Sequence, residues 1–214
     1  MKTKQHTVYK DADGKRLPGV TTITGELGWN KHVLVNWANR LGREGIDSTK
    51  YVDDKAAIGS LAHDMVMCHV LGTKVDTSDY SENQILQADN CLQSFFEWER
   101  GKVIKPILTE TMLVSNLYGF GGTPDLYAEV DGKLTLVDYK TGKGIYPEYS
   151  VQVGGGYYQL LEEAGHTIDR VIILNIPRAE DESFQVKEIK EIDVCRKIFV
   201  HCLNIYKLKK KICS

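Results

Sequence analysis

The feature that most constrains this chain is a two-residue turn, Asp131-Gly132, set between two runs of alternating apolar and polar residues. Such a dipeptide is the strongest short signal for a β-hairpin, because a type I′ turn needs positive φ at both central residues. The turn also sets the strand register, since each step outward pairs the next residue on either side. Continuing outward, Asp125 falls opposite Asp138, so we expect the two acids to share one face of the hairpin.

Two carboxylates directly opposed on antiparallel strands, with Cβ atoms about 5 Å apart, destabilise a sheet unless their repulsion is offset. A hard divalent cation offsets it, and Mg²⁺ is commonly held by one or two carboxylates. Lys140, two residues beyond Asp138, points to the same face because side chains alternate along a strand. The pattern indicates a Mg²⁺ site between Asp125 and Asp138 with an ammonium beside it; the open alternative is that both acids lie at solvated strand ends.

Two further positions are unusual. Glu110 alternates in phase with apolar neighbours and is expected on a buried face, where it either forms a structural salt bridge or faces the metal. Three successive glycines, at positions 154–156, lie in an expected helix and cost about 1 kcal/mol each. They predict close packing of that helix against the sheet or a nucleic-acid backbone, unless the segment is a loop. His63 lies at the edge of an apolar helical stripe and by itself indicates only a core or surface residue.

The length of 214 residues predicts a single domain, 1–214, and the hydrophobic fraction of 42% and charged fraction of 26% are ordinary for a soluble protein. We expect an N-terminal hairpin whose second extended piece lies around Val20 to Ile23. The remaining elements are expected as helices over about 31–72 and 81–101, strands within 105–140, a helix over about 149–163, strands at 170–177 and 184–186, and a terminal helix over about 193–210. The predicted class is α/β (mixed α+β), with residues 1–104 mainly helical and residues 105–214 containing the sheet.

Charge and cysteine content restrict the setting in which the protein acts. A formal net charge of −2 argues against tight non-specific wrapping of nucleic acid, although the segment YKLKKKIC leaves a local basic patch. Five cysteines without a CxxC pair fit reduced thiols. No apolar run has membrane-spanning length, and the first residues lack the apolar stretch of a secretory signal. We therefore expect a cytoplasmic protein without membrane contact.

Six blocks occur in the order of a known nuclease family. They are LPGVTTI followed by Trp37, GSLAH (Gly59–His63), Glu110, GGTPD (Gly121–Asp125), VDYKTG (Val137–Gly142), and VQ followed by tyrosines. The chain thus resembles the PD-(D/E)XK nucleases, in their RecB-like and phage exonuclease branch. The acid-to-acid spacing from Glu110 to Asp125 looks the same as in a mitochondrial genome-maintenance exonuclease of this family. The resemblance covers most of the chain and implies a central mixed β-sheet of the restriction-endonuclease-like type, flanked by helices, with residues 105–214 as the catalytic core.

The resemblance also implies a role for each matching residue. The implied metal ligands are His63, Asp125, Asp138 and the carbonyl of Tyr139. The implied catalytic residues are Asp125, Asp138, Lys140, Glu110, Gln152 and Tyr158. The implied nucleic-acid contacts are Gln152, Tyr157, Ser60 and Thr141. Lys140 would position or deprotonate the attacking water, and we expect its pKa to fall beside a metal in partial burial. Two positions depart from the family pattern: Met67 where an acid often follows the His by four residues, and Gly156 where a Tyr often follows the Gln by four.

The implied activity is Mg²⁺-dependent hydrolysis of DNA, with Mn²⁺ as a substitute ion, by an exonuclease that acts on DNA ends or single strands. The setting would be phage-type recombination or DNA processing, with a single-strand-annealing or other recombination partner, in the bacterial host cytoplasm if the chain is phage-encoded. Two other functions stay open: a structure- or sequence-specific endonuclease, and a non-catalytic nucleic-acid-binding module on a nuclease fold.

The mainly helical first half is expected to form a wall or arch over the site. Within it, Trp29, Trp37 and Tyr51 are candidates for stacking on bases, with the protein core as the alternative location. Some RecB-like relatives bind an iron–sulfur cluster through one early and three late cysteines. The wide spacing of the late cysteines here, at positions 195, 202 and 213, predicts no such cluster.

Overall fold

The computed structural model describes residues 7–179 and 182–213; the expectation about a secretory signal rests partly on residues 1–6, which lie outside the described residues. The helices are α1 (Val20–Thr24), α2 (Lys31–Arg43), α3 (Ser48–Leu71), α4 (Glu82–Glu99), α5 (Pro147–Val151), the π-helix η1 (Gln152–Tyr157), α6 (Tyr158–Glu163) and α7 (Ile192–Cys213). The strands are β1 (Tyr9–Lys10), β2 (Arg16–Leu17), β3 (Ile104–Thr109), β4 (Leu113–Ser115), β5 (Phe120–Gly122), β6 (Leu126–Val130), β7 (Lys133–Lys140), β8 (Arg170–Asn175) and β9 (Gln185–Glu188). No helix in this described part is long and apolar enough to cross a membrane.

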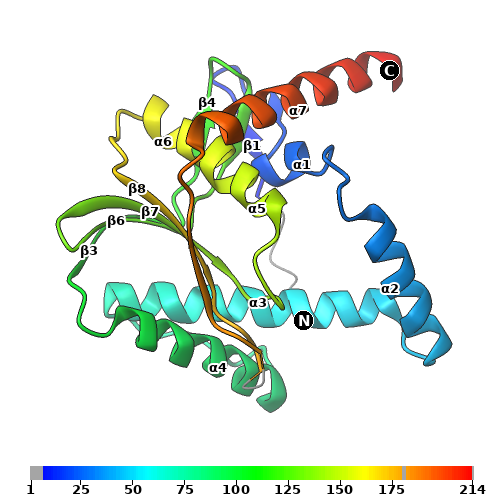
Figure 1. Cartoon of the computed structure of the whole chain (residues 1–214), viewed down its shortest axis with the longest axis vertical. Helices are drawn as coiled ribbons and strands as arrows, with labels where there is room; N and C mark the ends of the chain where they lie inside the picture. Colours follow the sequence, from blue (N-terminus) through cyan, green and yellow to red (C-terminus); the bar gives the residue numbers. More distant parts are fainter. Residues whose placement is uncertain (1–6, 180–181, 214) are drawn as a thin grey trace.

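A five-stranded sheet in the order β3-β6-β7-β8-β9 forms the centre of the molecule (Figure 1). Strands β7 and β8 run parallel, whereas the other neighbouring pairs are antiparallel. A parallel pair needs a long crossover connection, and the helical segment α5–η1–α6 supplies it. The mixed sheet flanked by helices confirms the predicted fold class.

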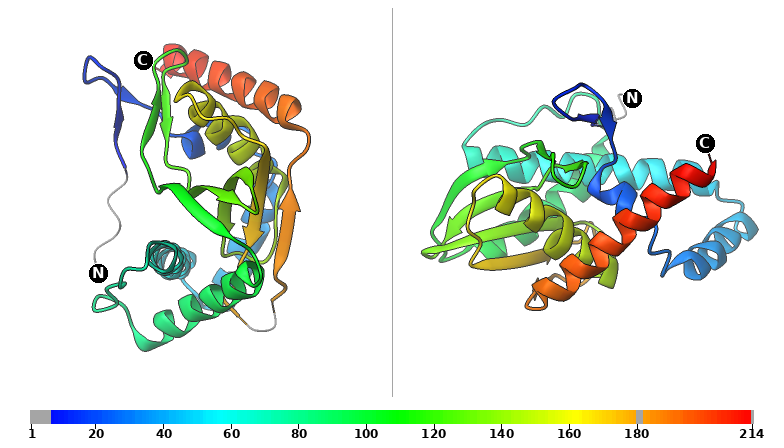
Figure 2. Two further views of the ribbon diagram at one scale, coloured as in Figure 1. Left: turned by 90° about the vertical axis from the view of Figure 1, so that its left-hand side faces the viewer. Right: turned by 90° about the horizontal axis from the view of Figure 1, so that it is seen from above.

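Helices cover both faces of this sheet, with α3 and α4 on one side and η1, α6 and α7 on the other (Figure 2). Because side chains alternate along a strand, each face has its own apolar core. Leu126 and Val137 face α3 and α4, while Tyr127 and Leu136 face the opposite helices. This alternation determines which side of the sheet the residues at the ends of β6 and β7 can reach.

The N-terminal hairpin is present, but its second strand is not the predicted one. Strand β1 pairs antiparallel with β2 at Arg16–Leu17, and the segment from Val20 to Ile23 is helical. Both Val20 and Ile23 are buried. Residues three apart share one side of a helix but lie on opposite faces of a strand, so a single helical turn buries both side chains.

The strand predicted to run through Glu110 is broken there. Strand β3 ends at Thr109, Glu110 has φ +40°, and the chain then forms β4, which pairs with β5 in a separate sheet. The predicted in-phase burial of Glu110 is therefore wrong, and its side chain is half-buried beyond the strand end. The positive φ, which costs a non-glycine residue about 1–2 kcal/mol, turns the chain out of the main sheet.

The glycine run lies in a helical segment, as predicted, and its close packing is confirmed. A Cβ on Gly155 would lie 2.7 Å from the Cys195 carbonyl oxygen, and one on Gly156 would lie 2.5 Å from Val20 Cγ1. The close neighbours are thus α7 and α1, and not the sheet or a nucleic-acid backbone as predicted. Glycine is needed here because two other helices pack directly against this backbone.

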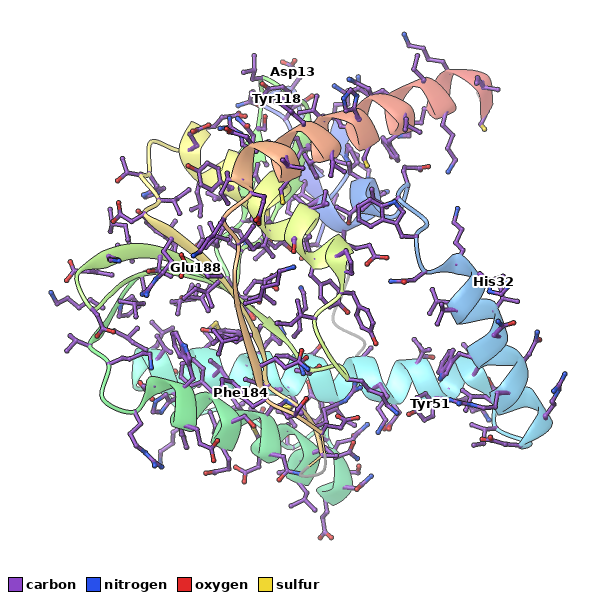
Figure 3. The ribbon with its side chains drawn as sticks, in the orientation of Figure 1. Asp13, His32, Tyr51, Tyr118, Phe184 and Glu188 are labelled. Carbon is purple, nitrogen blue, oxygen red and sulfur yellow. The ribbon has the colours of Figure 1, made fainter. Side chains whose placement is uncertain are left out.

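Only part of the helical first half stands apart from the sheet. Helices α3 and α4 pack together and onto the sheet through side chains such as Leu61, Phe95 and Tyr139. Helix α2 extends away from the body together with the first turns of α3, where Figure 3 marks His32 and Tyr51. The expected wall or arch therefore reduces to α2 and the start of α3.

The three aromatic residues of this region have mixed environments. Trp29 is 51% exposed and Tyr51 is 36% exposed, so the core location is wrong for both. Trp37 is half-buried and packs edge-on against Tyr51, with ring centroids 5.7 Å apart. The extended part of the molecule thus presents aromatic side chains to solvent.

Candidate active site

The β6–β7 hairpin has the predicted turn and register. Asp131 has φ +53° and Gly132 has φ +78°, as a type I′ turn requires. The Asp131 carboxylate also accepts a hydrogen bond of 2.9 Å from the backbone N–H of Val103, which ties the turn to the start of β3. The pairing of the strands from the turn out to Leu126 and Val137 confirms the predicted register.

One step beyond the last pair, Asp125 and Asp138 lie at the same end of the hairpin. Leu126 and Val137 face α3 and α4, so the next residue on each strand turns to the opposite face of the sheet. Burial acts to raise the pKa of both acids, and their shared neighbour Lys140 acts to lower both. The charge of Asp125 also raises the pKa of Asp138. The two carboxylates therefore converge on one side of the sheet, as the turn predicts.

Asp125 is held by two donors. The backbone N–H of Tyr139 donates to Oδ2 at 2.8 Å, and His63 Nδ1 from α3 lies 3.3 Å from Oδ1. Burial alone would raise the pKa of Asp125, but His63 and Lys140 lower it below its ordinary value. Burial lowers the pKa of His63, but Asp125 raises it by more, so the net change is an increase. Asp125 is thus an ionised carboxylate in a partly buried site.

Asp138 is almost inaccessible, with 1% of its surface exposed. Lys140 Nζ forms an ion pair with its Oδ2 at 2.7 Å, and this buried oxygen has no hydrogen-bond partner within residues 7–179 and 182–213. Burial raises the pKa of Asp138 to about 6, although Lys140 acts in the opposite direction. Asp138 therefore carries an incompletely compensated charge and an oxygen able to accept a further ligand.

Lys140 is enclosed by the two acids and by an aromatic ring. Its ammonium lies 4.8 Å from the ring centroid of Tyr149 on α5, within cation–π range. Burial lowers the pKa of Lys140, but Asp138 and Asp125 raise it more, so the net change is an increase. The predicted fall applies to an ammonium beside a bound cation and stays a prediction. Beside the two carboxylates, Lys140 is a protonated hydrogen-bond donor.

The donor set fits a hard divalent cation through two carboxylates. Within residues 7–179 and 182–213, no group of three or more His, Cys, Asp or Glu side chains is arranged to hold a metal. His63, Asp125 and Asp138 thus do not form a three-ligand cluster, since the His63 ring is paired with Asp125. Mg²⁺ needs only one or two protein carboxylates, and water and substrate oxygens complete its shell. Asp125 with the orphaned oxygen of Asp138 matches that requirement.

Glu110, Tyr157 and Gln152 lie near these acids. The Glu110 N–H donates to the Asp125 carbonyl at 3.0 Å, and its side chain helps line the same pocket as Asp125. Tyr157 lines this pocket too, and its hydroxyl accepts a hydrogen bond of 2.9 Å from Gln152 Nε2. Gln152 is buried, and its side-chain amide holds the Tyr157 hydroxyl in place.

The remaining predicted site residues lie in different surroundings. Tyr158 does not join the site: its ring packs under Arg196 at 5.5 Å and borders a different, smaller pocket. The Tyr139 side chain lies on the α3–α4 side, edge-on to His63 at 5.7 Å. Ser60 and Thr141 are half-buried, and a Cβ on the adjacent Gly59 would lie 3.1 Å from Thr141 Oγ1. Helix α3 therefore passes close to the end of β7 without beginning or bending there.

A pocket of about 630 Å³ opens beside Asp125. It is bordered by the N-terminal hairpin, α1 and the end of α7 as well as by the site residues. Two cations that sequence patterns did not single out, Arg16 and Lys210, contribute to its wall. Asp138 and Lys140 do not line it, so Asp125 is the acid that the pocket reaches directly. Lys210 belongs to the basic segment YKLKKKIC, whose composition does not reveal where it packs, and Arg16 carried no signal in the sequence.

Comparison with protein-family models and with curated proteins finds no match for this chain. Among solved structures, it is similar to a candidate exonuclease from Eubacterium rectale, with a TM-score of 0.48, 9% identity and coverage of 71% of this chain and 65% of that chain. It is also similar to an alkaline exonuclease from Laribacter hongkongensis, with a TM-score of 0.33, 16% identity and coverage of 72% and 84%. A complex of the latter with dAMP gives a TM-score of 0.34 at 15% identity, over 72% and 85% of the chains. The chain spans less than two thirds of the length of the Eubacterium rectale protein.

Proposed function

We propose that this protein is a Mg²⁺-dependent DNA nuclease of the PD-(D/E)XK kind, built on a restriction-endonuclease-like sheet. The observation that carries the proposal is the convergence of Asp125, Asp138 and Lys140 at one end of the β6–β7 hairpin, with an Asp138 oxygen that has no hydrogen bond among the described residues. Each acid contacts its own base, His63 for Asp125 and Lys140 for Asp138, yet the two carboxylates still converge on one another. A divalent cation bound between them would offset their mutual repulsion.

In this proposal Asp125 and Asp138 hold the cation, and the Tyr139 carbonyl is a further candidate ligand. When bound, Mg²⁺ lowers the pKa of an attacking water and neutralises charge that develops on the phosphate. Lys140 donates a hydrogen bond to the scissile phosphate or holds the water in line, and the Tyr149 ring beneath the ammonium restricts where it can point. His63 orients the Asp125 carboxylate through its Nδ1 contact.

The pocket beside Asp125 supports a nucleic-acid substrate. Arg16 and Lys210 place two positive charges on its wall, which would attract the phosphates on either side of the scissile one. Tyr157 offers a hydroxyl held in place by Gln152, and Ser60 and Thr141 are proposed backbone contacts near the end of β7. Glu110, on the same wall, is proposed to act near the same cation.

We propose exonuclease action on an end or a single strand in preference to internal cleavage. Trp29, just before α2, and Tyr51, at the start of α3, are exposed, and such side chains stack on unpaired bases. A role in phage-type recombination or DNA processing, with a recombination partner, belongs to the same proposal.

A nuclease assay with end-labelled single- and double-stranded DNA tests it. We expect cleavage with Mg²⁺ or Mn²⁺, none with EDTA, and a loss of about 100-fold or more in Asp125→Asn, Asp138→Asn and Lys140→Met. Lys105→Met, which removes an exposed lysine of the same sheet, is the matched control and should keep full activity. Metal-independent cleavage, or full activity in Asp138→Asn, would overturn the assignment.

Linear and circular single strands of equal length separate the two modes of cleavage. An exonuclease degrades the linear strand and leaves the circle intact. Equal cleavage of both would replace the exonuclease proposal by an endonuclease at the same site.

A further inference from the structure

The C-terminal half of α7 carries an apolar row that no other described element covers. Ile205, Leu208 and Ile212 are 52%, 57% and 85% exposed, and Val194, near the start of the helix, is 53% exposed. They lie on the side of the helix away from its buried residues, which include Phe199 and Leu203. Figure 1 shows this end of α7 extending beyond the rest of the fold. Single exposed apolar residues are ordinary, but a row at regular helical spacing is not.

The spacing of this row follows a coiled-coil pattern. Counting Val194, Ile198, His201, Ile205, Leu208 and Ile212, the steps alternate between four and three residues. These are the a and d positions of a heptad, with Ile at three successive a positions. We call this row the α7 stripe. The exposed part, with anchors at positions i, i+3 and i+7, has the form that receives another amphipathic helix.

The charged residues beside the α7 stripe indicate which kind of partner helix would bind there. Helix α7 contains six Lys or Arg residues and a single Asp. Lys197 and Lys211 occupy g positions along one edge of the stripe, and Lys209 occupies an e position on the other edge, where it reaches Glu26 at 2.9 Å. An acidic residue on the facing helix would pair with these lysines. A second copy of α7 would bring lysine against lysine, which disfavours self-pairing.

Two other ligands fit the α7 stripe less well. A membrane-surface helix buries a broad apolar face, usually with aromatic residues, whereas this row is narrow and wholly aliphatic apart from His201. Nucleic acid would gain little from aliphatic side chains that cannot stack on bases. Tyr206 and Lys210, which line the proposed substrate pocket, are on another side of α7.

We propose that the α7 stripe docks an acidic amphipathic helix of a partner protein. The surface lies outside the candidate active site, so this proposal does not depend on nuclease activity. The partner's Leu or Ile side chains would pack between Ile205, Leu208 and Ile212, and its flanking Glu or Asp residues would face Lys197 and Lys211.

Fluorescence anisotropy with three labelled synthetic peptides tests the proposal on the full chain. The acidic peptide has three heptads with Ile at a, Leu at d and Glu at e and g. One control replaces each Glu by Lys, and the other keeps Glu but replaces Ile and Leu by Ser. We expect the acidic peptide to bind about tenfold or more tightly than either control, and to weaken as salt rises from about 0.1 to about 0.5 M.

Surface variants locate the binding. Leu208→Asp should weaken the acidic peptide about tenfold or more, and Ile212→Asp, at the most exposed position, provides a second variant if the first is unstable. Leu86→Asp, a 62% exposed leucine on α4, is the matched control and should change binding by less than about twofold. Equal binding of all three peptides, or an unchanged affinity in both stripe variants, would overturn the proposal. So would a Leu208-dependent dimer in sedimentation, or Leu208-dependent binding to phosphatidylglycerol–phosphatidylcholine vesicles without peptide binding.

Discussion

Lys140 and Asp138 form a close ion pair in a nearly closed environment, and this pair differs physically from the ion pairs on the surface. The contact of 2.7 Å is matched in length by Lys105 with Glu129 at 2.6 Å, yet the latter side chains are 64% and 37% exposed. Exposed pairs are screened by water and contribute little to stability. The two ion pairs therefore differ in their contribution to stability because of their burial, and not because of their length.

Lys140→Met is expected to lower the free energy of unfolding by about 1–3 kcal/mol at neutral pH, because it leaves the Asp138 carboxylate buried without its cation. Urea denaturation at pH 7 measures this change. Lys105→Met should cost less than about 1 kcal/mol. Similar costs for the two variants would show that Asp138 is not dependent on Lys140.

Cys91 is predicted to be unreactive in the folded protein. Burial raises the pKa of its thiol to about 12, so almost no thiolate exists near pH 8. Cys213 is exposed and is expected to react first with a thiol reagent such as dithionitrobenzoate. Counting labelled cysteines by mass spectrometry, before and after addition of denaturant, checks the order. Rapid labelling of Cys91 without denaturant would contradict this account.

The crossover segment α5–η1–α6 is the element on which the site's support depends most. It carries Tyr149 over Lys140 and Tyr157 beside Asp125, and its glycine run lets α7 and α1 pack directly against its backbone. The π-helical turn follows Tyr149 and ends at Tyr157. Such turns are frequent at functional sites, which agrees with a segment that presents side chains and also packs tightly.

Gly155→Ala is expected to destabilise the protein by about 1–3 kcal/mol, because the new Cβ would lie 2.7 Å from the Cys195 carbonyl oxygen. Alanine is otherwise the better helix former. Gly42→Ala in α2 is the matched control: nothing lies within 4 Å of its added Cβ, so it should stabilise by up to about 1 kcal/mol. Thermal or urea unfolding of both variants measures the contrast, and a stabilised Gly155→Ala would refute the close approach.

At the scale of the whole molecule, three parts of the chain contribute to the candidate site. The hairpin β6–β7 supplies the acids, α3 supplies His63, and the N-terminal hairpin with α7 borders the pocket. A ligand bound at this junction would contact segments that lie far apart in the sequence. Its binding energy is therefore expected to add to global stability.

Mg²⁺ is expected to raise the melting temperature in a concentration-dependent way. At about one hundred times its Kd it would add about 2.7 kcal/mol, corresponding to roughly 5–10 °C for a chain of this size. Differential scanning fluorimetry with MgCl₂, against NaCl of equal ionic strength, measures the shift. The double variant Asp125→Asn with Asp138→Asn should show none. An equal shift in that variant would place the ion elsewhere.

Local sequence patterns were sufficient to predict most of the helices and strands and the central pair of acids. The Asp131-Gly132 turn and the period-two runs predicted the β6–β7 register, because both depend on the backbone preferences of neighbouring residues. The helices from residue 31 to 99 and the terminal helix followed from the spacing of apolar residues. In each case the signal lies within one element or one hairpin.

Contacts between distant segments depended on tertiary packing. Val20 to Ile23 became helical, and the strand through Glu110 broke, because burial and pairing with other elements outweighed the local alternation. The glycine run predicted a close approach but not its partners, α7 and α1. By itself the sequence determined most of the helices and strands and the opposed acids. Only the folded chain decided that His63 meets Asp125, that Tyr149 covers Lys140 and that Tyr158 turns away, because these contacts form when whole elements pack.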